Sequence, residues 1–172
     1  MTLERLGRHR ATKRDVFFAA LPSAERVNDI VLPTPHFVTL IAWNAEGEPV
    51  GAVSSVLEGL FAAGASYLCA WGSDCGRVHD IADEIDSHPS ELASPGDAVR
   101  MTTWHEHETL PEAVQFFLEN TEPHGYYASS TQSALALCIG SGMLAAQVRQ
   151  VIEDNPRLQR TGLRPAAERP NR

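Results

Sequence analysis

The densest group of side chains that could do chemistry is the run His105-Glu106-His107-Glu108. Imidazole and carboxylate groups act as general acids and bases. His105 and His107 could also hold a divalent metal ion with a third ligand, because side chains two positions apart on an extended segment point to the same side. The alternative is a polar loop whose carboxylates favour the start of the helix that follows.

A second candidate lies at Asp74-Cys75, where a helix is expected to begin. The backbone N–H groups of a helix start favour a thiolate, and His79 follows one turn later as a base for it. We therefore regard Cys75 as a candidate nucleophile, with Asp74 and His105 as the other candidate catalytic residues. The alternative is structural, with Asp74 or Ser73 as the helix cap and Cys75 as a small, buried or partly buried side chain.

The run Gly140-Ser141-Gly142 opens another expected helix after an apolar segment. Free N–H groups in such a turn can bind an anion, so Ser141 is a candidate ligand-binding residue. The run lacks the complete glycine pattern of a dinucleotide fold, because position 145 is alanine, and no Walker-type lysine follows it. A tight turn capped by Ser141 is the alternative.

Three strand-like segments each end in tryptophan, at Trp43, Trp71 and Trp104, and Asn44 follows the first of them. Indole rings can stack on a planar ligand or on a side chain of a partner. These four residues are therefore candidate ligand-binding residues. Tryptophans at a repeated structural position can instead close the end of the core.

Short apolar segments alternate with segments of helical periodicity along most of the chain. The expected strands cover residues 37–43, 67–71, 99–104 and 134–139. The expected helices cover residues 50–63, 75–87, 110–120 and 142–154. Residues 15–35 could add a short helix or a further strand. Because alternating strands and helices pair in parallel through right-handed crossovers, we expect an α/β fold, a three-layer Rossmann-like sandwich with a four-stranded, mostly parallel sheet.

The polarity of the four strands predicts their order. The first and fourth are the most apolar, as central strands covered on both faces should be, whereas the third carries Arg100 and Thr102 and suits an edge. This favours the order 3-2-1-4, with 2-1-3-4 as the second choice. Ligands of such sheets bind beyond the carboxyl ends of the strands, so we expect the candidate residues on one rim.

Charge divides the chain into three parts. Residues 1–14 and residues 157–172 each carry a net charge of +4, whereas residues 15–156 carry −16. We expect a single α/β domain at 15–156, between a flexible basic N-terminal tail at 1–14 and a disordered basic C-terminal tail at 157–172. An acidic domain repels phosphate backbones, which argues against nucleic acid as a partner.

The cysteines and the apolar segments of the sequence indicate the cellular compartment of the protein. No Cys-x-x-Cys pair exists among Cys69, Cys75 and Cys138, which indicates reduced thiols rather than a disulfide framework or a thiolate zinc site. No apolar run is long enough to span a membrane, and no apolar segment follows the basic start of the chain as in a secretory signal. We expect a cytoplasmic protein.

Four stretches carry a family resemblance: LCAWGSDC at 68–75, VHD at 78–80, TTWH at 102–105 and VQFFL at 114–118. In these stretches the chain resembles an uncharacterised family of small bacterial α/β domains of unknown function, and the likeness covers about residues 36–140. The resemblance implies a bacterial intracellular setting and no activity. The basic ends of the chain lie outside it.

Functions from different classes are compatible with these features. The charge division and the lack of a complete catalytic motif favour a soluble binding or regulatory module whose acidic surface contacts a protein partner. The alternative is a hydrolase or transferase that uses the polar residues at the C-terminal ends of the strands, with or without a divalent metal ion. A small-molecule ligand such as a nucleotide at residues 140–142 is a third hypothesis.

Overall fold

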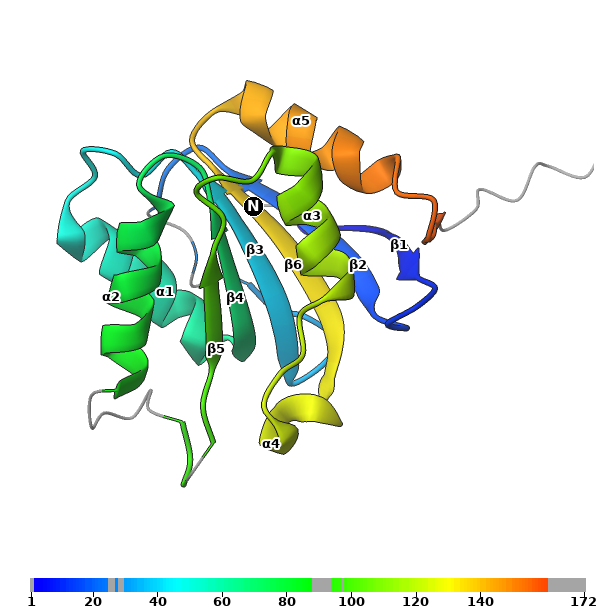
Figure 1. Ribbon diagram of the computed structural model, residues 1–172, viewed down its shortest axis with the longest axis horizontal. Helices are drawn as coiled ribbons and strands as arrows, with labels where there is room; N and C mark the ends of the chain where they lie inside the picture. Colours follow the sequence, from blue (N-terminus) through cyan, green and yellow to red (C-terminus); the bar gives the residue numbers. More distant parts are fainter. Residues whose placement is uncertain (1, 25–26, 28–29, 88–93, 97, 161–172) are drawn as a thin grey trace, which may run out of the picture.

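One sheet runs through the part of the protein that a computed structural model describes, residues 2–24, 27, 30–87, 94–96 and 98–160 (Figure 1). Its strands are β1 (Glu4–His9), β2 (Asp15–Leu21), β3 (His36–Trp43), β4 (Ala65–Trp71), β5 (Met101–Trp104), β6 (Thr131–Ile139) and β7 (Leu158–Arg160). The helices are α1 (Val50–Ala62), α2 (Cys75–Ser87), α3 (Leu110–Glu119), α4 (Gly125–Ala128) and α5 (Gly142–Glu153). The strand order is β5-β4-β3-β6-β2-β1-β7.

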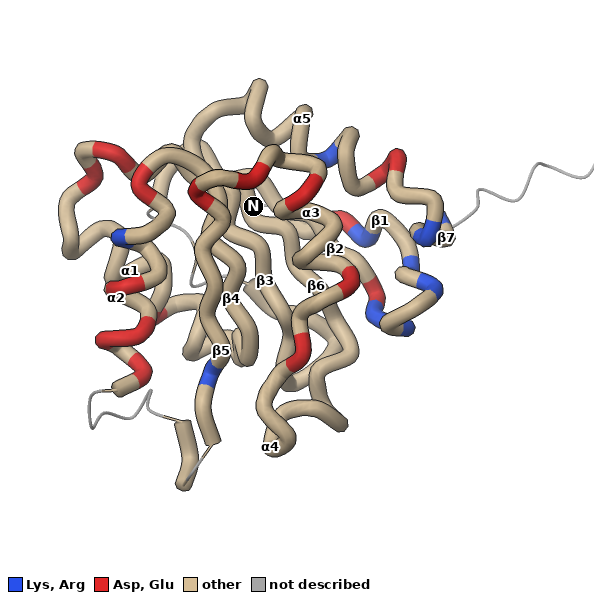
Figure 2. The backbone as a smooth tube through the Cα atoms, in the orientation of Figure 1, with Lys and Arg blue, Asp and Glu red and all other residues tan. Residues whose placement is uncertain are grey.

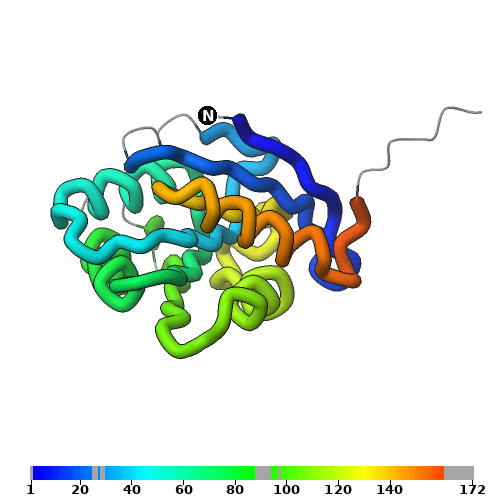
Figure 3. Tube along the Cα trace, turned by 90° about the horizontal axis from the view of Figure 1, so that it is seen from above, coloured from blue at the N-terminus to red at the C-terminus, as the bar shows by residue number. Residues whose placement is uncertain are grey.

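The strands from β5 to β2 run in the same direction, and β1 is antiparallel to both of its neighbours, β2 and β7. Helices cover both faces of the sheet, α1 and α2 on one face and α3 and α5 on the other (Figure 3). Along β3, Phe37 and Ile41 enter the core beneath α1 and α2, whereas Val38 and Leu40 enter the core beneath α3 and α5. Burial on both faces explains why this strand reads as a continuous apolar run.

The prediction of a four-stranded sheet is wrong, because β1, β2 and β7 extend it. The β1 sequence ERLGRH is too polar to give an apolar pattern, and β7 has only three residues. Neither the order 3-2-1-4 nor the order 2-1-3-4 describes the seven-stranded sheet. Within it, the four strands expected from the sequence lie side by side as β5, β4, β3 and β6 and run parallel.

The two basic ends of the chain contribute to the sheet. Residues 1–14, expected as a flexible tail, contain β1, which pairs with β2. Of the expected C-terminal tail, residues 158–160 form β7 and pair with β1, and residues 161–172 lie outside the described residues. Within the described ranges, no helix has the length and the apolar character needed to cross a membrane.

Charged residues are segregated in space (Figure 2). Lysine and arginine residues gather at the sheet edge formed by β1, the β1–β2 turn and β7. Aspartate and glutamate residues surround α2 and the loops that follow β3, β4 and β5. Since these three strands are parallel, the acidic loops meet at the carboxyl end of the sheet.

Candidate functional site

The loops after β3, β4 and β5 enclose an open depression of about 640 Å³, which we call the strand-end pocket. Its lining residues are Asn44, Glu46, Trp71, Gly72, Ser73, Asp74, His105, Glu106 and Glu108. Parallel pairing of β3 with β4 and of β4 with β5 places the three loops together. The site therefore lies at the carboxyl ends of the strands, where ligands bind in open parallel sheets.

Close contact between the first two loops shapes one wall of the pocket. Gly72 has a φ of +121°, and a Cβ atom added to it would lie 2.2 Å from the carbonyl oxygen of Trp43. The Ser73 N–H donates to the side-chain oxygen of Asn44 at 3.2 Å, and the Ala45 N–H donates to the carbonyl of Ser73 at 3.0 Å. The loop after β4 thus needs glycine at position 72 and uses Asn44 as its acceptor.

Arg77, in the first turn of α2, joins the same two loops. Its Nε atom lies 2.5 Å from a carboxylate oxygen of Asp74. Its other nitrogens donate to the carbonyls of Ala45 at 2.6 Å and Glu48 at 3.1 Å. Asp74 adopts a φ of +63°, in the left-handed region. The Asp74 carboxylate is therefore held in an ion pair with Arg77, which limits its use as a general base.

His105 lies at the floor of the pocket with 3% of its surface exposed. Its ring packs against Phe116 of α3, with centroids 4.8 Å apart. Its Nε2 atom lies 3.2 Å from the hydroxyl of Thr103. Its Nδ1 atom lies 3.4 Å from a carboxylate oxygen of Glu108 without hydrogen-bond geometry. A small movement of Glu108 would complete a carboxylate–imidazole hydrogen bond that orients the ring.

Negative charge dominates the strand-end pocket. Glu46, Asp74, Glu106 and Glu108 all line it, and Trp71 adds a half-buried indole ring. The Trp71 Nε1–H donates to the carbonyl of Glu108 at 3.0 Å, which ties the loop after β5 to the end of β4. Carboxylates beside an aromatic face suit a positively charged group, through charge attraction and cation–π contact.

The structure brings together some of the residues singled out in the sequence. Asn44, Trp71, Asp74 and His105 line the strand-end pocket. Trp43 and Cys75 are buried in the core instead. Sequence reasoning did not single out Glu46, although its position two residues after Asn44 in a strand-end loop is the signal that could have identified it.

The remaining candidates lie outside the pocket. Trp104 is 51% exposed and contacts His79, with ring centroids 4.4 Å apart and ring planes tilted by 58°. Ser141 caps α5 by accepting from the Leu144 N–H at 3.5 Å. His107 is exposed, whereas His105 is buried. No group of three or more His, Cys, Asp or Glu side chains in the described part of the chain is arranged to hold a metal ion.

The three thiols give a first testable prediction. Cys69, Cys75 and Cys138 are all buried, and burial raises the pKa of Cys69 and Cys138 to about 12. Burial also raises the pKa of Cys75, and a backbone hydrogen bond from His105 only partly opposes it. We expect no alkylation by iodoacetamide in the native protein at about pH 8, and labelling of all three after unfolding, measured by mass spectrometry. Native labelling of Cys75 would restore it as a candidate nucleophile.

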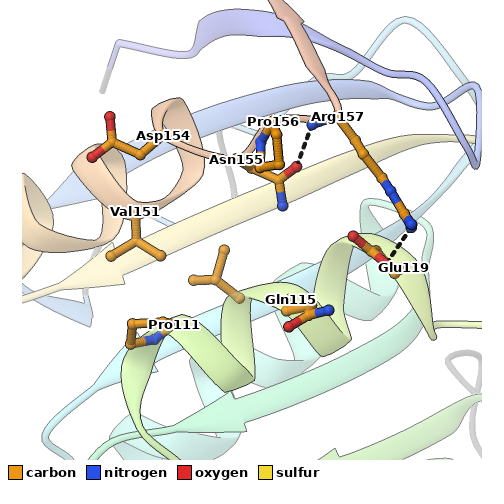
Figure 4. Close-up of a pocket in the computed structure, with 9 residues that line it drawn as sticks. Pro111, Gln115, Glu119, Val151, Asp154, Asn155, Pro156 and Arg157 are labelled. Carbon is orange, nitrogen blue, oxygen red and sulfur yellow. Dashed lines mark hydrogen bonds and ion pairs between the residues drawn. The ribbon is translucent and has the colours of Figure 1, made fainter.

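A second depression, of about 510 Å³, lies between α3 and α5 (Figure 4). Pro111 and Val151 give it an apolar wall, and the ion pair between Arg157 and Glu119, 2.5 Å long, closes one end. None of the candidate catalytic, ligand-binding or metal-binding residues lines this groove. Its strongest charges already pair with each other, so it has weaker electrostatic grounds to attract a charged ligand than the strand-end pocket.

Behind this groove, His9 is fully buried. Its Nδ1 atom lies 3.1 Å from the Thr12 hydroxyl, and its Nε2 atom, 3.9 Å from Glu119, has no hydrogen bond in the described structure. Burial lowers the pKa of His9, although Glu119 opposes the shift. Burial and the positive charge of Arg100 lower the pKa of His36 in the same way.

The lowered pKa values of His9 and His36 predict that the protein is less stable at acidic pH. Just below the ordinary histidine pKa of 6.5, the unfolded chain binds more protons than the folded protein, so the free energy of unfolding decreases as the pH falls. We expect this decrease to begin as the pH falls through the ordinary histidine pKa of 6.5 and to end below the lowered pKa values of the folded protein. Urea unfolding at several pH values measures it. His9→Gln should flatten the curve, and an unchanged slope would remove His9 as a cause.

Comparison with known proteins identifies a family but no activity. A family model described as "Domain of unknown function (DUF7684)" matches residues 16–155. No curated protein matches the chain. The resemblance to an uncharacterised family is confirmed, and the bacterial setting stays a prediction.

Proposed function

Since the chain belongs to the DUF7684 family, a domain of unknown function, we propose from its own residues that it is a binding module whose strand-end pocket receives a basic side chain of a protein partner. The observation that carries this proposal is the convergence of Glu46, Glu106 and Glu108 on one pocket beside the ring of Trp71. Glu46 and Glu106 form no ion pair within the described residues, so their charge is available to a ligand.

The surrounding surface supports a cationic partner. The acidic loops and α2 create an extended negative region (Figure 2), which raises the association rate of a basic protein and repels nucleic acid. Arg77 lies beside the pocket, where it is engaged by Asp74 and by two backbone carbonyls. A lysine or arginine of a partner would therefore meet Glu46 and Glu106, which form no ion pair in the part of the chain that the structure describes.

Binding of a fluorescein-labelled oligolysine peptide at low salt, measured by fluorescence anisotropy, tests this proposal. We expect Glu106→Gln with Glu108→Gln to weaken binding roughly tenfold, because both carboxylates contact the cation at close range. The matched control is Glu58→Gln with Asp154→Asn, which makes the same change in net charge at exposed positions outside the pocket. An equal loss in the two double variants would mean that only net charge matters and would refute the pocket.

The hydrolase or transferase alternative draws on one observation, the position of His105 beside Glu108 in the pocket. Such a pair could move a proton. Its candidate nucleophile, Cys75, is buried with a raised pKa, and Asp74 is paired with Arg77. The binding proposal therefore accounts for more of the pocket. We also propose the cytoplasm as the location, because all three thiols are free.

A further inference from the structure

The free edge of β5 is a second surface, next to the strand-end pocket. β5 ends the sheet and, among the described residues, pairs only with β4. We infer that this edge binds an extended segment of a basic protein partner, which joins the sheet as an additional strand beside β5. The inference rests on the proposed function and extends it from one side chain to a stretch of peptide.

The backbone of β5 has hydrogen-bonding groups directed away from the sheet. The His105 N–H donates to the carbonyl of Ala70 in β4 at 2.9 Å. Because backbone groups alternate between the two sides of a strand, Thr102 and Trp104 direct their N–H and C=O groups outward. The Arg100 N–H belongs to the same outward set and donates to the carboxylate of Asp86 at 3.1 Å. The Asp86 carboxylate thus accepts from Arg100 in the way that a backbone carbonyl of an added strand would accept from Thr102 or Trp104.

Apolar side chains are exposed along the same edge. Val99 is 49% exposed, Met101 41% and Trp104 51%. A depression of about 350 Å³ runs between this edge and α2, and Val99, Met101 and Asp83 are among its lining residues. The Trp104 ring also contacts the ring of His79 in α2, with the centroids 4.4 Å apart. An added strand would bury these side chains through cross-strand contacts.

Charge selects the kind of strand that fits. Asp80 and Asp83 of α2 flank the edge, with 81% and 52% of their side chains exposed. Arg100, a cation of this edge, is held by Asp86 and stacks over the ring of Phe61 at 4.7 Å. The segment that binds should therefore alternate basic and apolar residues. β5 leads directly into the loop that lines the strand-end pocket. A basic side chain of the bound segment can therefore enter that pocket.

A second copy of the chain fits this edge less well. Two β5 edges paired about a two-fold axis would bring the two acidic α2 helices together, and like charges repel. The opposite edge of the sheet offers Arg157 and Arg160 near β7, but these arginines are paired with Glu119 and Glu153. A separate basic partner meets neither obstacle.

The test uses a labelled peptide of about ten residues that alternates lysine and valine, with fluorescence anisotropy as the readout on the full chain. Two further peptides carry N-methyl groups on every second amide, one in each frame, which removes the N–H groups of one side of the strand. We expect one of the two methylated peptides to bind roughly tenfold more weakly than the parent. Val99→Lys with Met101→Lys should give a similar loss. The matched control is Val50→Lys with Met143→Lys, at positions 60% and 79% exposed on α1 and α5.

The outcomes separate this inference from the proposed function. Equal binding of the parent and both methylated peptides would overturn strand addition, while the oligolysine result at the pocket would stand. Failure of the parent peptide together with failure of oligolysine would overturn both. Sedimentation of the protein alone is the last measurement. A dimer that dissociates in the variant Val99→Lys with Met101→Lys would show that a second copy of the chain occupies the edge. That result would overturn the inference of a basic partner.

Discussion

Replacing Gly72 by alanine should lower the free energy of unfolding by about 3 kcal/mol. The φ of +121° is unfavourable for any residue with a side chain. The new Cβ atom would lie 2.2 Å from the carbonyl oxygen of Trp43, so the loop after β4 would have to separate from β3. Urea unfolding followed by tryptophan fluorescence measures the change, and the loss of the Asn44 contact should reduce oligolysine binding as well.

Gly51→Ala is the matched control for this substitution. Gly51 lies in the first turns of α1, and a Cβ atom there meets nothing within 4 Å. Alanine favours a helix over glycine by up to about 1 kcal/mol, so this variant should be slightly more stable than the natural protein. Equal stability of Gly72→Ala and Gly51→Ala would show that the first two loops of the pocket do not touch.

Replacing Arg77 by methionine should cost about 2 kcal/mol of unfolding free energy. Methionine keeps the aliphatic stem but removes the ion pair with Asp74 and the hydrogen bonds to the carbonyls of Ala45 and Glu48. Asp74 would then keep its left-handed backbone without the contact that compensates for it. Thermal and urea unfolding provide the measurement.

Arg160→Met is the control for the arginine substitution. Arg160 pairs with Glu153, but 58% of its side chain is exposed, and exposed ion pairs contribute less than about 1 kcal/mol. The contrast between the two variants is the prediction. If Arg160→Met lowers the free energy of unfolding as much as Arg77→Met does, the contacts of Arg77 with the pocket loops stabilise the protein no more than an exposed ion pair does.

The sequence predicts the centre of this fold better than its margins. β3, β4 and β6 are detectable because helices bury both of their faces, so each is an almost unbroken apolar segment. β1 lies one strand from the edge of the sheet and carries Glu4, Arg5 and Arg8. Its pairing with β2 is a local hairpin in which Arg8 lies opposite Asp15. The polar side chains of β1 hide this strand from a search for apolar segments.

The three tryptophans explain the mixed outcome for the candidate site. They lie at the ends of three parallel strands but one residue apart in register, because Trp71 lies opposite Ala42 and Trp104 lies opposite Ala70. Trp43 therefore packs in the core beneath α1 and α2, whereas Trp71 packs on the face that α3 and α5 cover. Trp43 ends a central strand and is buried, Trp71 is half-buried, and Trp104 ends the edge strand and is 51% exposed. Sequence spacing predicts that such residues share a rim, whereas the pairing register and the strand order decide which of them face a ligand.

The antiparallel pairing of β1 with β7 has a mechanical consequence. Gly7 pairs with Arg160 and His9 with Leu158, so the chain leaves both strands at the same end of the pair. A pulling force applied across the two ends of the protein would peel these strands apart one hydrogen bond at a time instead of shearing them together. This edge should therefore yield first and at low force, while β3, β4 and β5 keep their loops assembled on the far side of the sheet.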